Sequence, residues 1–123
     1  MGDREQTCQN VVEQFCKAWF EARNVEKTLE YLCSDIQYIG TAQQEAACGL
    51  EAMRAYLTAD IRALNTSFSV TFPSINCRLL QPALGTVFTE IILQNSQCAG
   101  HLRGFFILCC QGEQWKIQSL HFA

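Results

Sequence analysis

The sequence has 123 residues, of which 49% are hydrophobic and 17% are charged, and its formal net charge is -3. A chain of this length and composition buries a core of its own, so we expect one domain over residues 1–123. The net negative charge is not typical of a nucleic-acid-binding protein, which carries clustered basic residues. No apolar run reaches the roughly 18 residues that a membrane span needs.

The chain opens with a polar segment, Met1–Gln6, that does not resemble a signal peptide and therefore predicts a cytoplasmic protein. Apolar residues at helical spacing predict a first helix from about Asp3 to Arg23. Asn24 is a typical N-cap for a second helix. The buried stripe of that second helix is expected to comprise Val25, Leu29, Leu32 and Cys33.

A short strand and a third helix complete the first half of the chain. Alternation around Ile36 and Tyr38 predicts a strand that ends at Gly40. Residues 41–48 are expected to form an irregular connection. The third helix is expected to run from near Gly49 to about Leu64.

After Asn65 the period of the apolar residues changes from helical to alternating. This change predicts four strands, over residues 67–80, 86–94, 101–110 and 114–122. Short connections favour an antiparallel meander, in which Pro73 marks an edge or a bulge. The expected fold class is therefore α+β: a cone-like, curved antiparallel β-sheet covered by three N-terminal helices.

Turn positions predict which residues face one another in this sheet. Gly112-Glu113 suits a two-residue turn with glycine first, which places Trp115 opposite Cys110. The preceding loop is expected to centre on Gln97. Together these registers put three residues in one row on the helix-covered face: Glu90, Gly104 and His121.

That row suggests a catalytic pair, because a buried carboxyl group and an imidazole can exchange protons near neutral pH. Glu90 and His121 are the candidate catalytic residues. The alternative is a polar pair that only closes the end of the cone.

Apolar side chains on the opposite face would suit a partner protein, and they are Val87, Ile91, Leu93, Phe105, Ile107 and Leu120.

Aromatic residues are expected to line an internal pocket or to fill the core around it. Tyr38 and Tyr56 offer hydroxyl groups that could orient a ligand. The other expected pocket residues are Phe15, Trp19, Phe88, Phe106 and Trp115, together with Glu90 and His121.

The eight cysteines show no C-x-x-C spacing, and the sequence has only two histidines, so we expect no metal site and no cofactor. In a chain without a secretory signal, reduced thiols act as small apolar groups. The alternative is a redox role, for which Cys98 in a predicted loop is the best candidate.

Three stretches resemble the nuclear transport factor 2-like superfamily, in particular SnoaL-like proteins. They are Phe15–Trp19, the pair of segments Ser34–Thr41 and Gly49–Leu57, and the ending Trp115–His121. The resemblance covers essentially the whole chain. It implies a curved sheet with an internal pocket and frequent dimerisation through the outer face of the sheet, but no single activity.

Ketosteroid isomerase, an enzyme of that superfamily, is a useful comparison. Its general-base aspartate would fall at about Gly40, and its first-helix tyrosine near Phe15 or Cys16, so this machinery is missing. We therefore favour a non-catalytic or sensory domain that binds a small hydrophobic or aromatic ligand and forms homodimers. The alternatives are an enzyme that transfers protons on a hydrophobic carbonyl substrate through His121 and Glu90, and an assembly module.

Overall fold

Helices and short strands precede four long strands in the computed structural model, which describes residues 3–123. Met1 and Gly2, which belong to the polar segment at the start of the sequence, lie outside the described residues. The elements are α1 (Asp3–Phe20), α2 (Val25–Leu29), β1 (Leu32–Ile39), β2 (Ala46–Cys48), α3 (Leu50–Ala63), β3 (Ser69–Gln81), β4 (Leu84–Gln94), β5 (Ala99–Gln111) and β6 (Gln114–Phe122).

The first two helices are shorter than the sequence pattern predicted. Helix α1 ends at Phe20, and Arg23 adopts a left-handed backbone with φ of 52°, which a right-handed helix cannot continue. The predicted cap of α2 is confirmed, because the side chain of Asn24 accepts a hydrogen bond from the backbone N–H of Lys27 at 3.0 Å. Leu32 and Cys33 belong to β1 rather than to α2.

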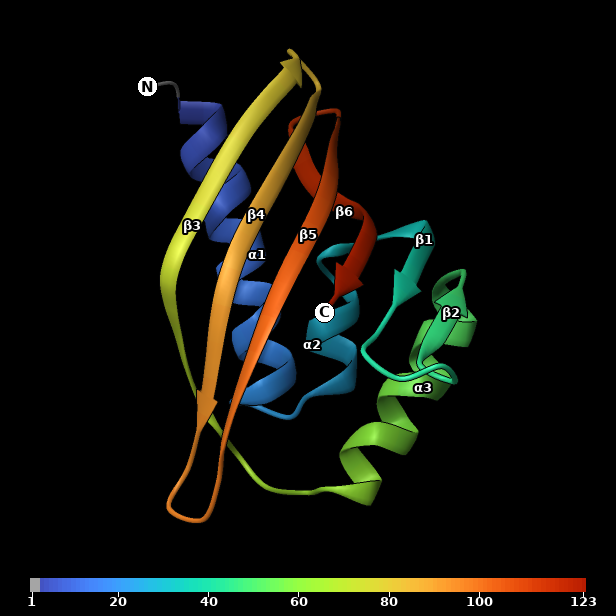
Figure 1. Ribbon diagram of the computed structural model, residues 1–123. Coiled ribbons are helices and arrows are strands. Elements are labelled where there is room, and N and C mark those ends of the chain that lie inside the picture. The colour runs from blue at the N-terminus through green and yellow to red at the C-terminus, as the bar shows by residue number, and fades with distance from the viewer. Residues whose placement is uncertain (1–2) are drawn as a thin grey trace.

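The strands form one six-stranded sheet in the order β2-β1-β6-β5-β4-β3. Figure 1 shows α1 lying behind the long strands, so the helix covers one face of the sheet. The predicted α+β class and the meander from β3 to β6 are confirmed. The sheet is mixed rather than wholly antiparallel, since β1 runs parallel to β6, and β2 occupies part of the expected irregular connection.

The strand registers decide which face each side chain takes. The predicted pair Trp115 and Cys110 is confirmed, as is the bulge at Pro73, where the register of β3 shifts between Thr71 and Ser74. Beyond Ile117 the register of β6 shifts by one residue, because Gln118 is an extra residue between two paired positions.

A second one-residue difference arises at the loop between β4 and β5. Gln94 pairs with Ala99, so the loop holds an even number of residues and does not centre on Gln97. The side chain of Asn95 closes this loop by accepting hydrogen bonds from the backbone N–H groups of Gln97 and Cys98, both at 2.9 Å.

These two shifts overturn the predicted faces of β4 and of the end of β6. The residues that point toward the helices include Val87, Thr89, Ile91, Gly104, Phe106, Leu120 and Phe122, all of which are buried. Of the apolar residues expected on the outer face, Val87, Ile91 and Leu120 are therefore inside. Glu90 and His121 are outside, because a one-residue slip along a strand moves a side chain to the other face.

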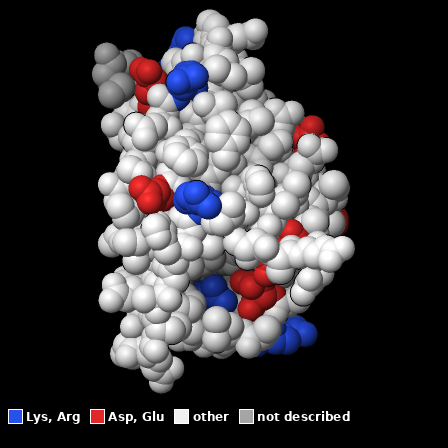
Figure 2. All heavy atoms as spheres, in the orientation of Figure 1, with Lys and Arg blue, Asp and Glu red and all other residues white. Residues whose placement is uncertain are grey.

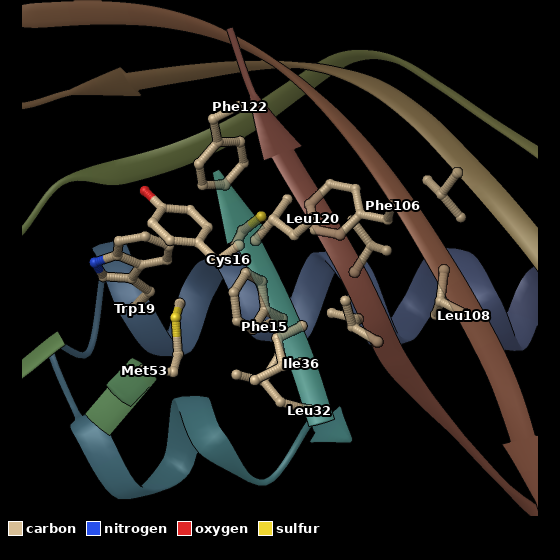
Figure 3. Close-up of a cluster of buried hydrophobic side chains, with 14 of the residues drawn as sticks. Phe15, Cys16, Trp19, Leu32, Ile36, Met53, Phe106, Leu108, Leu120 and Phe122 are labelled. Carbon is tan, nitrogen blue, oxygen red and sulfur yellow. The ribbon is translucent and has the colours of Figure 1, made fainter. Parts of the chain in front are cut away.

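The core lies between the inner face of the sheet and the helices. Phe15 and Phe106 are fully buried and meet edge to face, with ring centroids 6.1 Å apart. Trp19 and Phe122 lie at one end of this cluster and Leu108 at the other (Figure 3). In the part of the chain that the structure describes, no helix has the length and apolar character needed to cross a membrane.

Candidate functional site

The predicted row of Glu90, Gly104 and His121 does not form, because Glu90 and His121 lie on the outer face of the sheet and Gly104 lies on the inner face. Glu90 lies opposite Arg103, and its carboxylate accepts a hydrogen bond from Ser74 at 3.1 Å and lies 3.3 Å from the imidazole of His101. His121 lies opposite Phe105 in another row of the sheet. The structure does not bring the two candidates together, and neither reaches the interior.

The predicted pocket aromatics divide into three groups. Phe15 and Phe106 are core residues without access to a cavity, and Trp115 is buried on the inner face near the β5–β6 turn. Phe88 is on the outer face with 47% of its surface exposed, the opposite of its predicted position. The remaining three, Trp19, Tyr38 and Tyr56, line one cavity.

That cavity has a volume of about 120 Å³ and lies at the end of the core where Trp19 and Phe122 meet (Figure 3). Its walls come from α1, from β1 and the segment after it, from α3, and from the ends of β5 and β6. The lining residues are Trp19, Phe20, Tyr38, Thr41, Glu45, Tyr56, Asp60, Leu102 and Phe122.

Aromatic rings form most of the walls and meet at steep angles. Trp19 stands at 89° to Tyr56 and at 68° to Tyr38, with ring centroids 6.1 and 5.8 Å apart. Phe122 stands at 82° to Tyr38. Phe20 stacks on Trp19 at 16° and holds the indole ring from one side. Edge-to-face packing of this kind fixes the rings, so the cavity is preformed.

Two phenol groups of the lining are in direct contact. The hydroxyl of Tyr38 donates a hydrogen bond to the hydroxyl of Tyr56 at 3.2 Å. Burial raises the pKa of both tyrosines above the ordinary value, and the bond to Tyr56 adds to the rise for Tyr38. Both phenols are therefore neutral near pH 7, and the proton of Tyr56 remains available to donate to a ligand.

Two carboxylates that the sequence analysis missed complete the lining. Oδ2 of Asp60 accepts a hydrogen bond from the indole nitrogen of Trp19 at 2.9 Å. Oε1 of Glu45 accepts three, from the backbone N–H and the hydroxyl of Thr41 and from the backbone N–H of Ala42, at 2.9–3.1 Å. Asp60 follows Tyr56 by four residues on α3, the helical spacing that puts two side chains on one face, so this carboxylate could have been inferred from its tyrosine.

Gly40 gives the two phenols and Glu45 the space they need. A β-carbon on Gly40 would lie 2.5 Å from the hydroxyl of Tyr38 and 2.5 Å from Oε1 of Glu45, closer than real atoms approach. This glycine ends β1, where the sequence pattern placed the end of the strand.

One arginine lies beside the cavity without lining it. The guanidinium of Arg23 donates to the backbone carbonyls of Trp19 at 3.3 Å and Leu64 at 2.6 Å, and it lies 3.8 Å from Oδ2 of Asp60. Burial lowers the pKa of Arg23, and the charge of Asp60 opposes that shift. Arg23 thus ties the end of α1 to the end of α3 and partly balances Asp60.

The arrangement offers hydrogen-bond donors, carboxylates and aromatic surface. Across residues 3–123, no three His, Cys, Asp or Glu side chains come together as metal ligands would.

Comparisons with known proteins agree with this fold. Residues 8–123 match the family model described as the SnoaL-like domain. No curated protein matches the sequence. Among solved structures, a nuclear transport factor 2-like protein of unknown function from Pseudomonas putida KT2440 is similar, with a TM-score of 0.85 at 15% identity over 98% of this chain and 85% of that one.

Two further structures carry enzyme names. A ketosteroid isomerase-like protein from Erwinia carotovora atroseptica SCRI1043 has a TM-score of 0.81 at 8% identity, over 99% of this chain and 96% of that one. A putative scytalone dehydratase from Novosphingobium aromaticivorans DSM 12444 has a TM-score of 0.78 at 15% identity, over 95% of this chain and 80% of that one. At such identities the likeness shows a shared fold and no shared activity.

Proposed function

This chain belongs to the SnoaL-like domain family, and we propose that it binds a small molecule in the cavity between Trp19, Tyr38, Tyr56 and Asp60. The observation that carries the proposal is a preformed cavity in which aromatic walls and six hydrogen-bonding side chains converge, namely Trp19, Tyr38, Thr41, Glu45, Tyr56 and Asp60. Ligand sites in proteins combine apolar walls with a few placed polar groups in this way.

The cavity's polar groups support binding more directly than they support catalysis. Asp60 and Glu45 already accept hydrogen bonds from neighbouring residues, which fixes their orientation. Tyr38 is committed to Tyr56. The proton-transfer alternative through Glu90 and His121 loses its basis, because both side chains lie on the outer face of the sheet.

Trp19 provides a reporter for binding, since its indole ring forms one wall of the cavity. The second tryptophan is removed by the Trp115→Phe variant, so that emission comes from Trp19 alone. A panel of small aromatic, carbonyl and amine compounds is titrated while emission and thermal unfolding are followed. Binding is expected to change the emission and to raise the melting temperature, as ligand binding to the native state requires.

A matched variant separates the cavity from other surfaces. Tyr56→Trp fills the cavity and is expected to abolish the rise in melting temperature that the ligand causes, whereas Tyr31→Trp, on a partly exposed residue outside the cavity, is expected to leave that rise intact. Both comparisons use the melting temperature to confirm folding. If every compound fails to bind, or if Tyr56→Trp leaves binding unaltered, the proposal is wrong.

A second function, assembly into a homodimer, is favoured by the outer face of the sheet. Phe88, Phe105, His121 and Ile39 form one row across four strands, and Phe88 and Phe105 expose 47% and 43% of their surfaces. Figure 2, which views this side of the molecule, shows few charged groups over the long strands. An exposed apolar surface of this kind on a sheet suits a second copy of the chain.

Light scattering coupled to gel filtration tests the assembly. The wild-type chain is expected to elute with twice the monomer mass, and Phe105→Lys is expected to shift it to the monomer. Leu64→Lys provides the control, because Leu64 is 54% exposed at the end of α3, away from the sheet. A wild-type monomer at high concentration, or a dimer that survives Phe105→Lys, would contradict the proposal.

A further inference from the structure

Among residues 3–123, the lining of the cavity carries two carboxylates and no basic side chain, and we infer that its ligand is a small organic cation, a substituted ammonium group. This inference rests on the proposed function and names the ligand class that the same cavity takes. It narrows the small hydrophobic or aromatic ligand that the sequence analysis favoured to one that carries a positive charge.

Charge is the first part of the argument. Glu45 and Asp60 give the lining two formal negative charges. The guanidinium of Arg23 lies 3.8 Å from Oδ2 of Asp60, is not part of the lining, and donates hydrogen bonds to the carbonyls of Trp19 and Leu64. An anionic ligand would meet two carboxylates at close range, which costs free energy in a partly desolvated site, whereas a cation would be attracted by both.

The aromatic walls are the second part. The rings of Trp19, Tyr38 and Tyr56 stand at angles between 48° and 89° to one another, so they border the cavity from different directions. Aromatic faces attract cations through the ring quadrupole, and quaternary ammonium groups are recognised by sets of aromatic rings arranged in this way. A neutral ligand would gain from the apolar area but not from this attraction.

Size is the third part. A volume of about 120 Å³ equals roughly four water molecules at about 30 Å³ each. The cavity therefore admits a compact head group such as a methylated ammonium and leaves a longer chain outside. The hydroxyl of Tyr56 can donate to an oxygen carried by such a ligand, because it accepts rather than donates in the bond with Tyr38.

Choline and 3,3-dimethylbutan-1-ol provide a matched pair of probes, since they have nearly the same shape and differ in charge. Each is titrated into the full chain carrying Trp115→Phe, with Trp19 emission as the readout. Choline is expected to bind at least ten-fold more tightly than the alcohol. Its affinity is expected to fall as salt increases, because salt screens charge, while that of the alcohol stays nearly constant.

Charge-removing variants locate the effect. Asp60→Asn keeps an oxygen that can accept from Trp19, and Glu45→Gln keeps one for Thr41, so both preserve hydrogen bonding. Each is expected to weaken choline binding by about ten-fold or more, with little change for the alcohol. Asp35→Asn removes an exposed carboxylate that is not part of the lining and is expected to change neither probe.

The outcomes distinguish this inference from the function on which it rests. Equal affinities for choline and the alcohol, or choline binding that neither charge variant weakens, would overturn the inference while leaving a small-molecule site. Binding of neutral compounds from the panel without binding of choline would do the same. Failure of every compound, choline included, would overturn both, and the melting temperature of each variant shows whether the fold is intact.

Discussion

The indole nitrogen of Trp19 donates a hydrogen bond to Oδ2 of Asp60 at 2.9 Å, and the two residues are 41 positions apart in the chain. This bond joins α1 to α3 beside the cavity and orients both a wall and a charge of the proposed site. Trp19 is only 2% exposed, so its N–H group depends on Asp60 rather than on water.

Removing this acceptor is expected to destabilise the protein. Asp60→Ala leaves a buried N–H without a partner, for which the expected loss is about 1–3 kcal/mol of unfolding free energy. Asp60→Asn is expected to lose less, because an amide oxygen still accepts from Trp19, and both variants remove the charge that faces Arg23. Urea unfolding followed by circular dichroism measures the difference. Equal losses would show that the charge, and not the hydrogen bond, is what matters.

Two adjacent phenylalanines test the assignment of the sheet faces. Phe106 is fully buried on the inner face, and Phe105 is 43% exposed on the outer face. Phe106→Ala is expected to lower the unfolding free energy by about 3–5 kcal/mol, because it removes a core side chain and leaves a cavity. Phe105→Ala, measured at a concentration low enough to dissociate a dimer, is expected to change it by about 0.5 kcal/mol or less. The reverse order would mean that the register of β5 is wrong.

A methyl group at Gly40 is expected to disturb the cavity. In Gly40→Ala the new β-carbon must push aside the Tyr38 hydroxyl and Glu45, and overpacking of this kind costs about 1–3 kcal/mol. Gly100→Ala is the control, because a β-carbon there meets no atom within 4 Å. Thermal unfolding and Trp19 emission are measured for both. A Gly40→Ala variant as stable as Gly100→Ala would contradict the close packing around Tyr38.

Alkaline pH is expected to destabilise the protein through its buried thiols. Burial raises the pKa of Cys8 and Cys33 to about 12 and that of Cys16 further, from a usual value near 9. Above pH 9 the unfolded chain loses these protons and the native chain keeps them. The unfolded state then binds fewer protons than the native state, so stability falls as pH rises, by up to about 1.4 kcal/mol per pH unit for a fully buried thiol such as Cys16.

Urea unfolding at pH 8 and pH 10.5 measures this effect. Cys16→Ala is expected to flatten the pH dependence, although it lowers stability at both values. Cys98→Ala is the control, because Cys98 is exposed in the β4–β5 loop and should leave the slope unchanged. A stability that is constant or rises between the two pH values would contradict the protonated state assigned to the buried thiols.

The sequence pattern predicted the elements better than it predicted their faces. Alternation located β3 to β6 within a few residues, since each strand buries every second side chain. Gly49 and Asn24 correctly marked the starts of two helices. The backbone conformation of Gly49 and the capping side chain of Asn24 are local properties that can be read from the sequence. The parallel pairing of β1 with β6 joins segments about 80 residues apart and has no local signal.

The candidate site was predicted in part, for a related reason. Tyr38 and Tyr56 were predicted to line a pocket because they are aromatic and carry hydroxyl groups, and both line the cavity, but their hydrogen bond to each other was not predicted. Glu90 and His121 were placed by counting along strands, and the extra residue Gln118 and the Asn95 loop each moved the count by one. Glu45 was missed because it lies between elements, where no period applies.

The extra residue in β6 has a consequence for comparisons within the family. It determines that Leu120 and Phe122 face the helices and that His121 faces outward. In a relative that lacks one residue at this point of the strand, the side chains that follow would move to the opposite faces of the sheet although none of them had been substituted. Its cavity could gain an imidazole and lose a phenyl ring through a single deletion, so alignments of this strand that ignore gaps would compare side chains from opposite sides of the molecule.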